Sequence, residues 1–343
     1  MQPFRLCLIG FGNVGQAFAR LLLAKQAELF QKYAIQFSVT GIATGRHGKA
    51  IDPSGLDLEK ALALIASRQP LFSLSTLNPP ESMPDFIRAC PADVMFENTP
   101  VNHHDGQPAV EHVRTALENN LNCITANKGT VVYGYRQLTA LATSHNKRFL
   151  FESAVMDGAP IFSLFRASLP AVHLAGFKGI LNSTTNLILG RMENGESLAE
   201  AIAYSQSVGL AETDPSADVD GWDAAIKVAA LVTVLMDRPL TPLEVNRQGI
   251  RGITPQMVAG ARASGERWKL VCRASLAQGQ LQTSVAPERV SPASALYAVS
   301  GSSSYCEFEL DTLPGLGITE NDPGPQTTAY GLLADFINLA RGL

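Results

Sequence analysis

The stretch FRLCLIGFGNVGQAFARLLLAKQ, residues 4–26, decides the fold of this chain. Its first part, residues 4–9, is a short and mainly apolar run with the length of a buried parallel strand. GFGNVG follows at residues 10–15, and the residues after it repeat apolar side chains at the spacing of a core-facing helix. A strand, a glycine-rich turn and a helix in this order form the context that a dinucleotide-binding turn requires.

Each glycine of the turn has its own expected role. Gly10 would make the tight bend, Gly12 would let the backbone approach a pyrophosphate, and Gly15 would allow the helix to pack closely. The helix N-terminus, with Asn13 and Val14, would face the negative charge of the ligand. The alternative is a glycine turn without a ligand, but the position and flanks of this turn favour the dinucleotide.

The end of the second expected strand indicates which dinucleotide is bound. The strand IQFSVTGIATG, residues 35–45, runs into Thr44, Gly45, Arg46 and His47 without an acidic residue that could bind a ribose 2'-hydroxyl. Arg46, with Thr44 beside it, would suit the 2'-phosphate of NADP, because a guanidinium pairs well with phosphate oxygens. The alternative is a solvated loop arginine. The sequence therefore favours NADP and leaves NAD open.

Composition excludes several classes of protein. The 343 residues suffice for two or three compact units, and a net charge of −4 gives no electrostatic case for nucleic acid or an anionic membrane. The five cysteines are scattered and form no CxxC pair, which argues against a disulfide framework or a zinc site and favours the reducing cytoplasm. We expect neither a signal peptide nor a membrane span.

The pattern of expected strands and helices divides the chain into two parts. Residues 1–151 alternate expected strands and helices, which predicts a doubly wound parallel sheet, a Rossmann-like dinucleotide-binding domain. Ligands of such sheets bind beyond the carboxyl ends of the strands, so the loops ENTPVN at 97–102 and TANKG at 125–129 are candidate site loops.

The second part, residues 152–309, is expected to be an α+β domain for substrate binding and dimerisation. RWKLVCRASL at 267–276 and QLQTSVAPERV at 280–290 are typical of antiparallel strands, and WDAAIKVAALVTVLM at 222–236 of a buried helix. We expect a C-terminal helix, at about residues 310–343, to pack back on the first domain.

Charged residues concentrate in AETDPSADVDGWDAAIK, residues 211–227. Asp218 and Asp220 fit the role of helix caps. Asp223 and Lys227, four residues apart, share a helix face, where an exposed pair would contribute only ~0.3 kcal/mol. This helix carries no other charge before Asp237, so we expect it to be buried. A buried ion pair stabilises poorly against its desolvation, which favours a functional pair over the structural alternative.

Lysine suits the chemistry that a nicotinamide cofactor implies. Hydride transfer to an aldehyde carbon leaves negative charge on its oxygen, and a desolvated ammonium can stabilise that charge and give up a proton. Lys128, expected in the loop after a parallel strand, would stand near the nicotinamide; a surface lysine is the alternative.

Five segments, in order and spacing, resemble the homoserine dehydrogenases: GFGNVG, TANKG, ESAVMDGAPI, GILNSTTNLIL and AETDPSADVDGWDAAIK. The resemblance covers residues 4 to about 235 and continues more weakly to the C-terminus. It implies the NADPH- or NADH-dependent reduction of L-aspartate 4-semialdehyde to L-homoserine, in the route to threonine and methionine. The chain resembles a short form without a kinase or C-terminal regulatory domain.

The resemblance also implies roles for single residues. Lys227 would donate and accept the proton, Asp223 would hold Lys227, and Lys128 would touch both cofactor and substrate. The amino-acid end of the substrate would be bound by Glu212, Asp218, Lys128 and Thr184. The loop Thr99–Pro100 and Gly324 would lie along the cofactor. A monovalent cation, Na+ or K+, would be held by four main-chain carbonyls, those of Glu152, Val155, Asp157 and Ala159.

The chain departs from the family pattern at three places. Ser183 replaces a usual glycine, Met156 and Asp157 stand where the cation loop usually has glycines, and the C-terminal glycine-rich segment keeps only Gly324 and a Thr-Ala pair. The expected enzyme works on a small-molecule substrate, as a homodimer. Its rivals are another small-aldehyde reductase of the same architecture and a non-catalytic NADP-binding sensor or scaffold.

Overall fold

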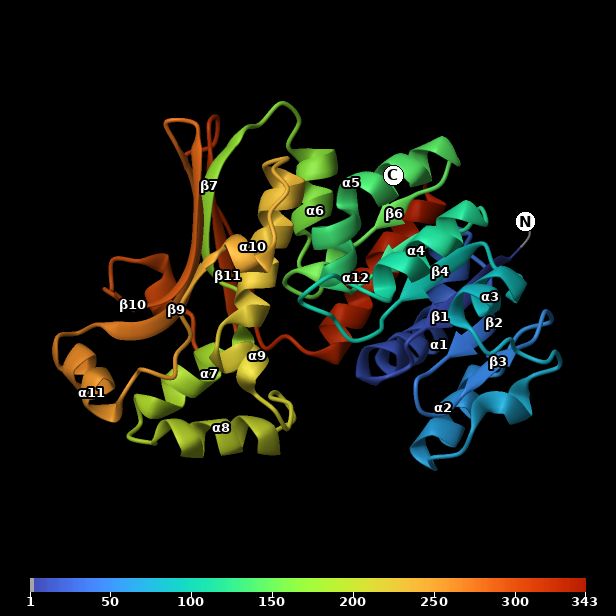
Figure 1. The fold of residues 1–343 in the computed structure, drawn as a ribbon, viewed down its shortest axis with the longest axis horizontal. Coiled ribbons are helices and arrows are strands. Elements are labelled where there is room, and N and C mark those ends of the chain that lie inside the picture. Colours follow the sequence, from blue (N-terminus) through green and yellow to red (C-terminus); the bar gives the residue numbers. More distant parts are fainter. Residues whose placement is uncertain (1–2) are drawn as a thin grey trace. The chain divides into compact units, whose positions relative to one another are not determined.

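The computed structural model describes residues 3–343, and the chain falls into two compact units (Figure 1). The first unit comprises Met1–Ser163 and Pro325–Leu343, and the second comprises Leu164–Gly324. Each unit contains one sheet of six strands.

The sheet of the first unit is the predicted doubly wound sheet. Its spatial order is β3-β2-β1-β4-β5-β6, and every pair is parallel except the β2–β3 hairpin. The order reverses between β1 and β4, which is where such sheets bind ligands. The strands are β1 (Phe4–Ile9), β2 (Phe37–Ala43), β3 (Lys49–Ile51), β4 (Val94–Glu97), β5 (Asn122–Thr125) and β6 (Phe149–Leu150).

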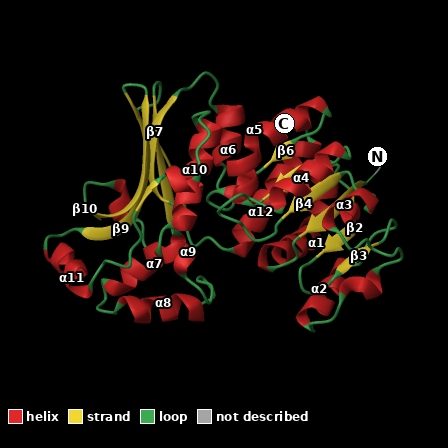
Figure 2. Cartoon of the chain, in the orientation of Figure 1, coloured by secondary structure: helices red, strands yellow, loops and turns green. Residues whose placement is uncertain are grey.

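Helices lie on both sides of this sheet, as Figure 2 shows in red around the yellow strands. They are α1 (Asn13–Tyr33), α2 (Leu58–Ala66), α3 (Met83–Ala89), α4 (Ala109–Glu118), α5 (Lys128–Ser144), α6 (Ile161–Ser163) and α12 (Pro325–Ala340). The central strands are apolar on both faces, and residues such as Leu6, Leu8 and Phe96 are fully buried. Such continuous apolar strands are expected where helices cover both faces.

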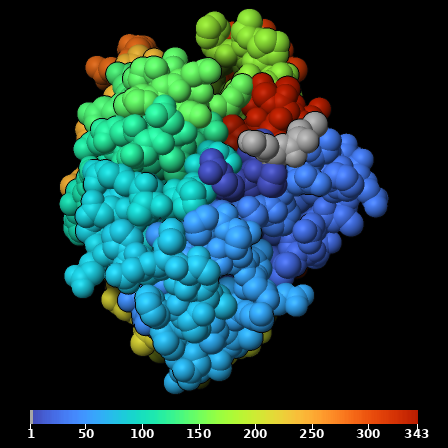
Figure 3. Space-filling view, turned by 90° about the vertical axis from the view of Figure 1, so that its right-hand side faces the viewer, coloured from blue at the N-terminus to red at the C-terminus, as the bar shows by residue number. Residues whose placement is uncertain are grey.

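The C-terminal helix α12 belongs to the core of the first unit. The ring of Phe336 meets those of Phe4 and Phe96 edge-on, at centroid distances of 5.4 and 5.9 Å. Arg148 donates hydrogen bonds to the carbonyls of Gly342, at 2.8 Å, and of Leu343. In Figure 3 part of the C-terminal segment, in red, lies at the surface beside blue N-terminal residues. The chain end is thus tied into the first unit.

The sheet of the second unit has the order β12-β11-β7-β9-β10-β8 and is antiparallel except for the short β8–β10 pair. Its strands are β7 (Leu174–Ile180), β8 (Asn246–Arg247), β9 (Arg267–Ala277), β10 (Gln280–Val290), β11 (Ser304–Leu310) and β12 (Leu316–Glu320). Its helices are α7 (Ser183–Met192), α8 (Leu198–Ser207), α9 (Ser216–Val219), α10 (Trp222–Leu235) and α11 (Pro255–Ala263). The predicted fold class, a parallel α/β domain plus an α+β domain, is confirmed.

The expectation of a helix from about residue 310 is wrong for its first part. Leu316–Glu320 forms β12, which pairs antiparallel with β11 from Phe308 to Ser304. Its burial alternates along the strand, so the segment suits a sheet edge better than a helix. The helix begins only at Pro325, a residue that favours a helix start because its missing N–H needs no partner there.

Candidate active site

The glycine turn of the first unit has the geometry that its sequence predicts. Gly10 has a φ of +87°, and a Cβ there would lie 2.5 Å from the carbonyl carbon of Asn98. A Cβ on Gly15 would collide with the carbonyl oxygen of Gly10. These two glycines are therefore required by the close passage of β1, the β4 loop and α1.

Gly12 is a glycine for a different reason. It is the N-cap residue of α1, and a Cβ there would meet no atom within 4 Å. No side chain caps α1 and its first turn holds no acidic residue, while Gly12 and Asn13 are exposed. The first amide groups of a helix and its dipole favour an anion. The open N-terminus of α1 therefore fits a pyrophosphate.

The loops after β4 and β5 are held together at the carboxyl edge of the same sheet. The Asn127 side chain donates to the carbonyl of Thr99, at 2.9 Å, and accepts from the amide of Gly129, at 2.9 Å. The Thr99 hydroxyl donates to Glu97, a fully buried carboxylate. Thr99 and the exposed Pro100 therefore lie on a loop whose main chain is fixed from two sides.

Asn98 lies in the candidate loop 97–102, but it was not singled out from the sequence. Its carboxamide oxygen and nitrogen are both buried without a hydrogen-bond partner among the described residues. Buried polar groups of this kind are rare and call for an explanation. Asn98 follows β4 and lies against Gly10, at the point where the strand order reverses. A dinucleotide beside this turn would supply the missing partners, so the residues present fit such a ligand.

Arg46 lies in the hairpin that joins β2 and β3. Thr44 closes this hairpin, because its amide donates to the carbonyl of Gly48 at 2.9 Å and its hydroxyl accepts from the amide of His47 at 2.6 Å. Arg46 is exposed. The structure thus places an exposed guanidinium just beyond the carboxyl end of β2.

Two further residues predicted to bind the cofactor lie at the beginning of a helix or directly before one. Lys128 was expected in a loop, but it is the first residue of α5, because the Asn127 side chain caps this helix one residue earlier. Gly324 directly precedes Pro325, where α12 begins.

The expected cation loop has a left-handed turn although its glycines are missing. Met156 and Asp157 have φ values of +52° and +47°. The Asp157 carboxylate accepts from the hydroxyl of Thr328, at 2.7 Å, which holds this turn. The Glu152 carboxylate accepts from the amides of Phe162 and Ser163, at 2.7 and 2.8 Å, so its side chain caps α6.

Ala159 closes the same loop, since its amide donates to the carbonyl of Met156, at 2.8 Å. Its own carbonyl accepts from the amide of Ile161, at 2.9 Å. Val155, which precedes Met156, is buried. Within residues 3–343, no group of three or more acidic, histidine or cysteine side chains could hold a metal ion. Side-chain ligation of a metal ion therefore has no support among these residues, and cation binding by the four main-chain carbonyls stays a prediction.

The predicted lysine pair lies on α10 in the second unit. Lys227 Nζ is 3.1 Å from Asp223 Oδ2, and the two side chains are only 15% and 17% exposed. Lys227 Nζ also donates to the carbonyl of Leu181, at 2.6 Å. Residues on either side of the pair, such as Ala224 and Val228, are fully buried in the helix. The pair is thus a mostly buried group that the fold holds at a fixed place.

Asn182 joins two carboxylates of this cluster. Its carboxamide nitrogen donates to Asp218 Oδ1, at 2.6 Å, and to Asp223 Oδ2, at 3.0 Å. Burial, and then the nearby charge of Asp223, raise the pKa of the Asp218 carboxyl to about 6. Asn182 was not among the predicted site residues, although it lies between the strand β7 and the helix α7 in the GILNSTTN segment.

Neither Asp218 nor Asp220 caps α10, although Asp218 lies in the first turn of α9, where its charge can favour the helix dipole. Gly221 is the N-cap residue of α10 and makes no side-chain cap. Asp218 instead accepts from Asn182, while Asp220 pairs with Arg251. The reason is the left-handed conformation of Gly221, with a φ of +80°, which turns the chain between α9 and α10.

The other predicted substrate residues lie in the same unit. Thr184 is buried in the first turn of α7, and its hydroxyl is 3.5 Å from the carbonyl of Leu210. Glu212 is exposed in the loop before α9, where its carbonyl accepts from Gln206. Ser183, at the start of α7, contacts the hydroxyl of Ser304 at 3.1 Å.

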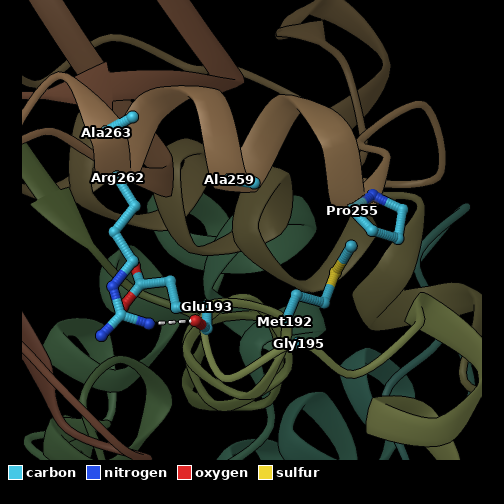
Figure 4. A pocket seen from close by; sticks show the side chains of 7 residues that line it. All are labelled: Met192, Glu193, Gly195, Pro255, Ala259, Arg262 and Ala263. Carbon is cyan, nitrogen blue, oxygen red and sulfur yellow. Dashed lines mark hydrogen bonds between the residues drawn. The ribbon is translucent and has the colours of Figure 1, made fainter.

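A separate pocket of about 360 Å³ opens between the end of α7 and α11 (Figure 4). Arg262 points toward Glu193 there and donates to its carbonyl, while the Glu193 carboxylate pairs with Arg267. Its lining includes none of the predicted site residues.

The first unit holds a dinucleotide-type turn, and the second holds a mostly buried lysine beside a carboxylate. Each is a feature that a nicotinamide-dependent oxidoreductase would need. Comparison with known proteins gives the family. A family model described as homoserine dehydrogenase matches residues 160–337, and one described as homoserine dehydrogenase, NAD binding domain, matches residues 10–152. The chain belongs to the homoserine dehydrogenase family, and it is an NAD(P)-dependent oxidoreductase.

Similar proteins match the chain over its length. An NAD(+)-dependent homoserine dehydrogenase of Pseudomonas canavaninivorans is 33% identical over 99% of this chain and 97% of its own. A homoserine dehydrogenase of Methanocaldococcus jannaschii is 32% identical over 97% and 98%. The crystal structure of a homoserine dehydrogenase from Thiobacillus denitrificans has a TM-score of 0.82 and 26% identity, over 99% of this chain and 74% of that one. None of the helices formed by residues 3–343 is long and apolar enough to cross a membrane.

Proposed function

We propose that this enzyme interconverts L-homoserine and L-aspartate 4-semialdehyde with NADP(H) in preference to NAD(H), and that Lys227 carries the proton. The observation that carries the proposal is the mostly buried lysine–carboxylate cluster on α10, fixed from three sides. Purified protein should reduce NADP+ and, more weakly, NAD+ only when homoserine is added. If both cofactors bind but neither is reduced, the chain is instead a non-catalytic binding protein. If other hydroxy substrates react faster, it is another small-aldehyde reductase.

Apart from Gly324, the groups proposed for the cofactor belong to the first unit. The N-terminus of α1, from Gly12 to Val14, would hold the pyrophosphate, and the loop of Thr99 and Pro100 would lie along the dinucleotide. Lys128 at the start of α5 and Gly324 are proposed for the same ligand. When bound, the nicotinamide supplies or accepts the hydride. The unpartnered carboxamide of Asn98 supports a ligand at this turn.

Lys227 is proposed to move the proton. Its amine is held by Asp223 and by the carbonyl of Leu181, which fixes the position of the nitrogen. In homoserine oxidation the unprotonated amine would accept the hydroxyl proton, and in the reverse direction the ammonium would return it to the oxygen. Asp223 favours the ammonium by its charge and thereby tunes the basicity of the lysine.

Asp218, Glu212 and Thr184 are proposed for the amino-acid end of the substrate. The substrate carries an ammonium group, which the carboxylate of Asp218 could pair with, while the part of Glu212 follows from the resemblance. Asp218 lies within the hydrogen-bond network of Asn182. Its carboxyl, with a pKa of about 6, is mostly ionised at pH 7 and becomes protonated in acid. Binding of the substrate ammonium should therefore weaken below pH 6.

The cofactor preference can be tested at Arg46. In Arg46→Asp the exposed guanidinium beyond β2 is replaced by a carboxylate that repels a 2'-phosphate but can bind ribose hydroxyls. We expect the Kd of NADP to rise by about tenfold to a hundredfold, as for one lost charge-assisted contact. The Kd of NAD should stay or fall. Equal losses for the two cofactors would show that Arg46 does not bind the 2'-phosphate.

A second prediction concerns the cation. We propose that the main-chain carbonyls of Glu152, Val155, Asp157 and Ala159 bind Na+ or K+, because the left-handed residues Met156 and Asp157 keep the loop on the path that glycines would take. Activity in potassium or sodium chloride should then exceed activity in tetramethylammonium chloride of the same ionic strength. Equal rates in the three salts would reject the cation site.

We further propose that the enzyme is a cytoplasmic homodimer that serves threonine and methionine biosynthesis. All five cysteines are buried free thiols, which suits a reducing compartment. The oligomeric state can be measured by light scattering of the purified protein, where a mass of twice 36.6 kDa supports the dimer.

A further inference from the structure

We propose that Asn182 is a positioning residue of the reaction, whose carboxamide holds Asp218 and Asp223 in the arrangement that Lys227 and the substrate need. The inference rests on the proposed function, because it gives Asn182 a task in that same site. Nothing in the resemblance assigns a role to this residue. Its support is a set of contacts within the second unit.

The orientation of the Asn182 amide is fixed from behind. Asn182 is the N-cap of α7 and is only 3% exposed. Its oxygen accepts from the amide of Thr185 and from the hydroxyl of Thr185, both at 2.8 Å. Because the oxygen is committed to the helix, the nitrogen must point away from it, toward α9 and α10.

Both hydrogens of that nitrogen are used by carboxylates. One contact is 2.6 Å long, to Asp218 on α9, and the other is 3.0 Å long, to Asp223 on α10. Hydrogen bonds to charged acceptors are roughly twice as strong as neutral ones. The acceptor on Asp223 is Oδ2, the same atom that faces Lys227 Nζ. One neutral amide thus bridges a carboxylate proposed for the substrate and the carboxylate that holds the lysine.

The charges around the bridge explain why a neutral donor is needed. Asp218 faces Asp223 and Lys227 of α10, and Asn182 and Thr184 of α7. On β9, Cys272 interacts with Lys227 and Asp223, and burial raises the pKa of its thiol to about 12, so it stays neutral. Two carboxylates thus share one lysine, and the donor between them offsets their repulsion without competing for that lysine.

The bridge has a predictable effect on proton binding. A donor that bonds the ionised form of a carboxyl lowers its pKa, and Asn182 acts in this direction on Asp218. Removal of the donor should therefore raise the pKa of Asp218 above its present value. The acidic limb of kcat/KM for homoserine would move to higher pH, and activity near pH 6 would fall more than activity near pH 8.

Two variants separate the bridge from the helix cap. Asn182→Ser and Asn182→Asp both keep an oxygen that can cap α7, but neither can donate to the two carboxylates as the amide does. We expect kcat/KM for homoserine to fall by about tenfold to a hundredfold in Asn182→Ser, from the loss of hydrogen bonds to charged groups. The acidic limb of the kcat/KM profile should move to higher pH in Asn182→Ser. It should move further in Asn182→Asp, because that variant adds a negative charge. The Kd of NADP should not change.

Thr254→Ala is the matched control for lost capping. Thr254 caps α11 in the same unit by accepting from the amide of Met257, at 3.2 Å. The Thr254→Ala substitution should lower the melting temperature by about 2–4 °C and leave the pH profile of kcat/KM for homoserine unchanged.

If Asn182→Ser behaves like this control, with an unmoved acidic limb, Asn182 is only a cap and the proposal is overturned. Wild-type kcat/KM and pH profile in both Asn182 variants would also overturn it. Wild-type protein that oxidises no homoserine would reject the proposed function itself, and with it the role of Asn182.

Discussion

In Lys227→Ala, turnover of homoserine oxidation is expected to fall by about 10²–10⁴, the usual yield of a general acid–base group. The reason is geometric. Lys227 Nζ is held within 3.1 Å of Asp223 and 2.6 Å of the Leu181 carbonyl, in a mostly buried site. Alanine removes the only basic group of this cluster among the described residues, so the hydroxyl proton has no acceptor there. Initial rates at saturating homoserine and NADP+ measure the effect.

Three controls belong to this prediction. The Kd of NADP should barely change, because the glycine turn lies in the other unit. The melting temperature should fall only modestly, since Asp223 keeps its bond from Asn182 and the apolar packing of α10 remains. Asp223→Asn should lower turnover less than Lys227→Ala, because the amide can still accept from the lysine although the charge is gone.

The second large effect is expected at Gly12. In Gly12→Asp the Kd of NADP should rise by about 10²-fold or more, since like charges placed together cost several kcal/mol. The new carboxylate would occupy the N-terminus of α1, where the pyrophosphate is proposed to bind. Folding should not suffer. A Cβ at residue 12 meets no atom within 4 Å, and aspartate is a good N-cap.

Gly10→Ala serves as the comparison for Gly12→Asp, because it should lower stability and not remove a contact with NADP. Its φ of +87° and its contact with Asn98 leave no room for a Cβ, so this variant should lose stability before it loses a ligand contact. Isothermal titration with NADP and thermal melting of both variants separate the two effects. A Gly12→Asp protein that binds NADP as tightly as wild type would show that the pyrophosphate is held elsewhere.

Features that depend on residues close together in the sequence could be predicted from local sequence patterns. The strand, glycine turn and helix at residues 4–26 specify their own conformation, and the parallel sheet follows from the alternation after them. Asp223 and Lys227 were predicted to pair because residues four apart share a helix face, and they lie 3.1 Å apart. The burial of this pair followed from the absence of other charges on α10.

Contacts between distant segments could not be read in the same way. Asn182 reaches Asp218 and Asp223 across 36 and 41 residues, a pairing that depends on how α7 packs beside α9 and α10. Asn98 is notable only because its amide is buried without a partner, which no sequence pattern shows. Glu212 is exposed in a loop, so its assignment still depends on the resemblance alone.

Local backbone conformation was the other feature that could not be predicted from the sequence. The turn at Met156 and Asp157 takes positive φ without glycine, because Thr328 of the distant helix α12 holds the Asp157 side chain. Likewise, Lys128 begins a helix rather than a loop, since Asn127 caps that helix with its side chain. In both cases one side-chain hydrogen bond decides the local path of the chain.

Chemical rescue of Lys227→Ala tests most directly whether this lysine carries the proton. The purified variant, with saturating homoserine and NADP+, would be assayed with increasing methylamine at several pH values. If Lys227 is the proton acceptor, turnover should start low and rise with the concentration of the unprotonated amine. A folded, NADP-binding variant that oxidises homoserine at the wild-type rate before any amine is added would contradict this mechanism.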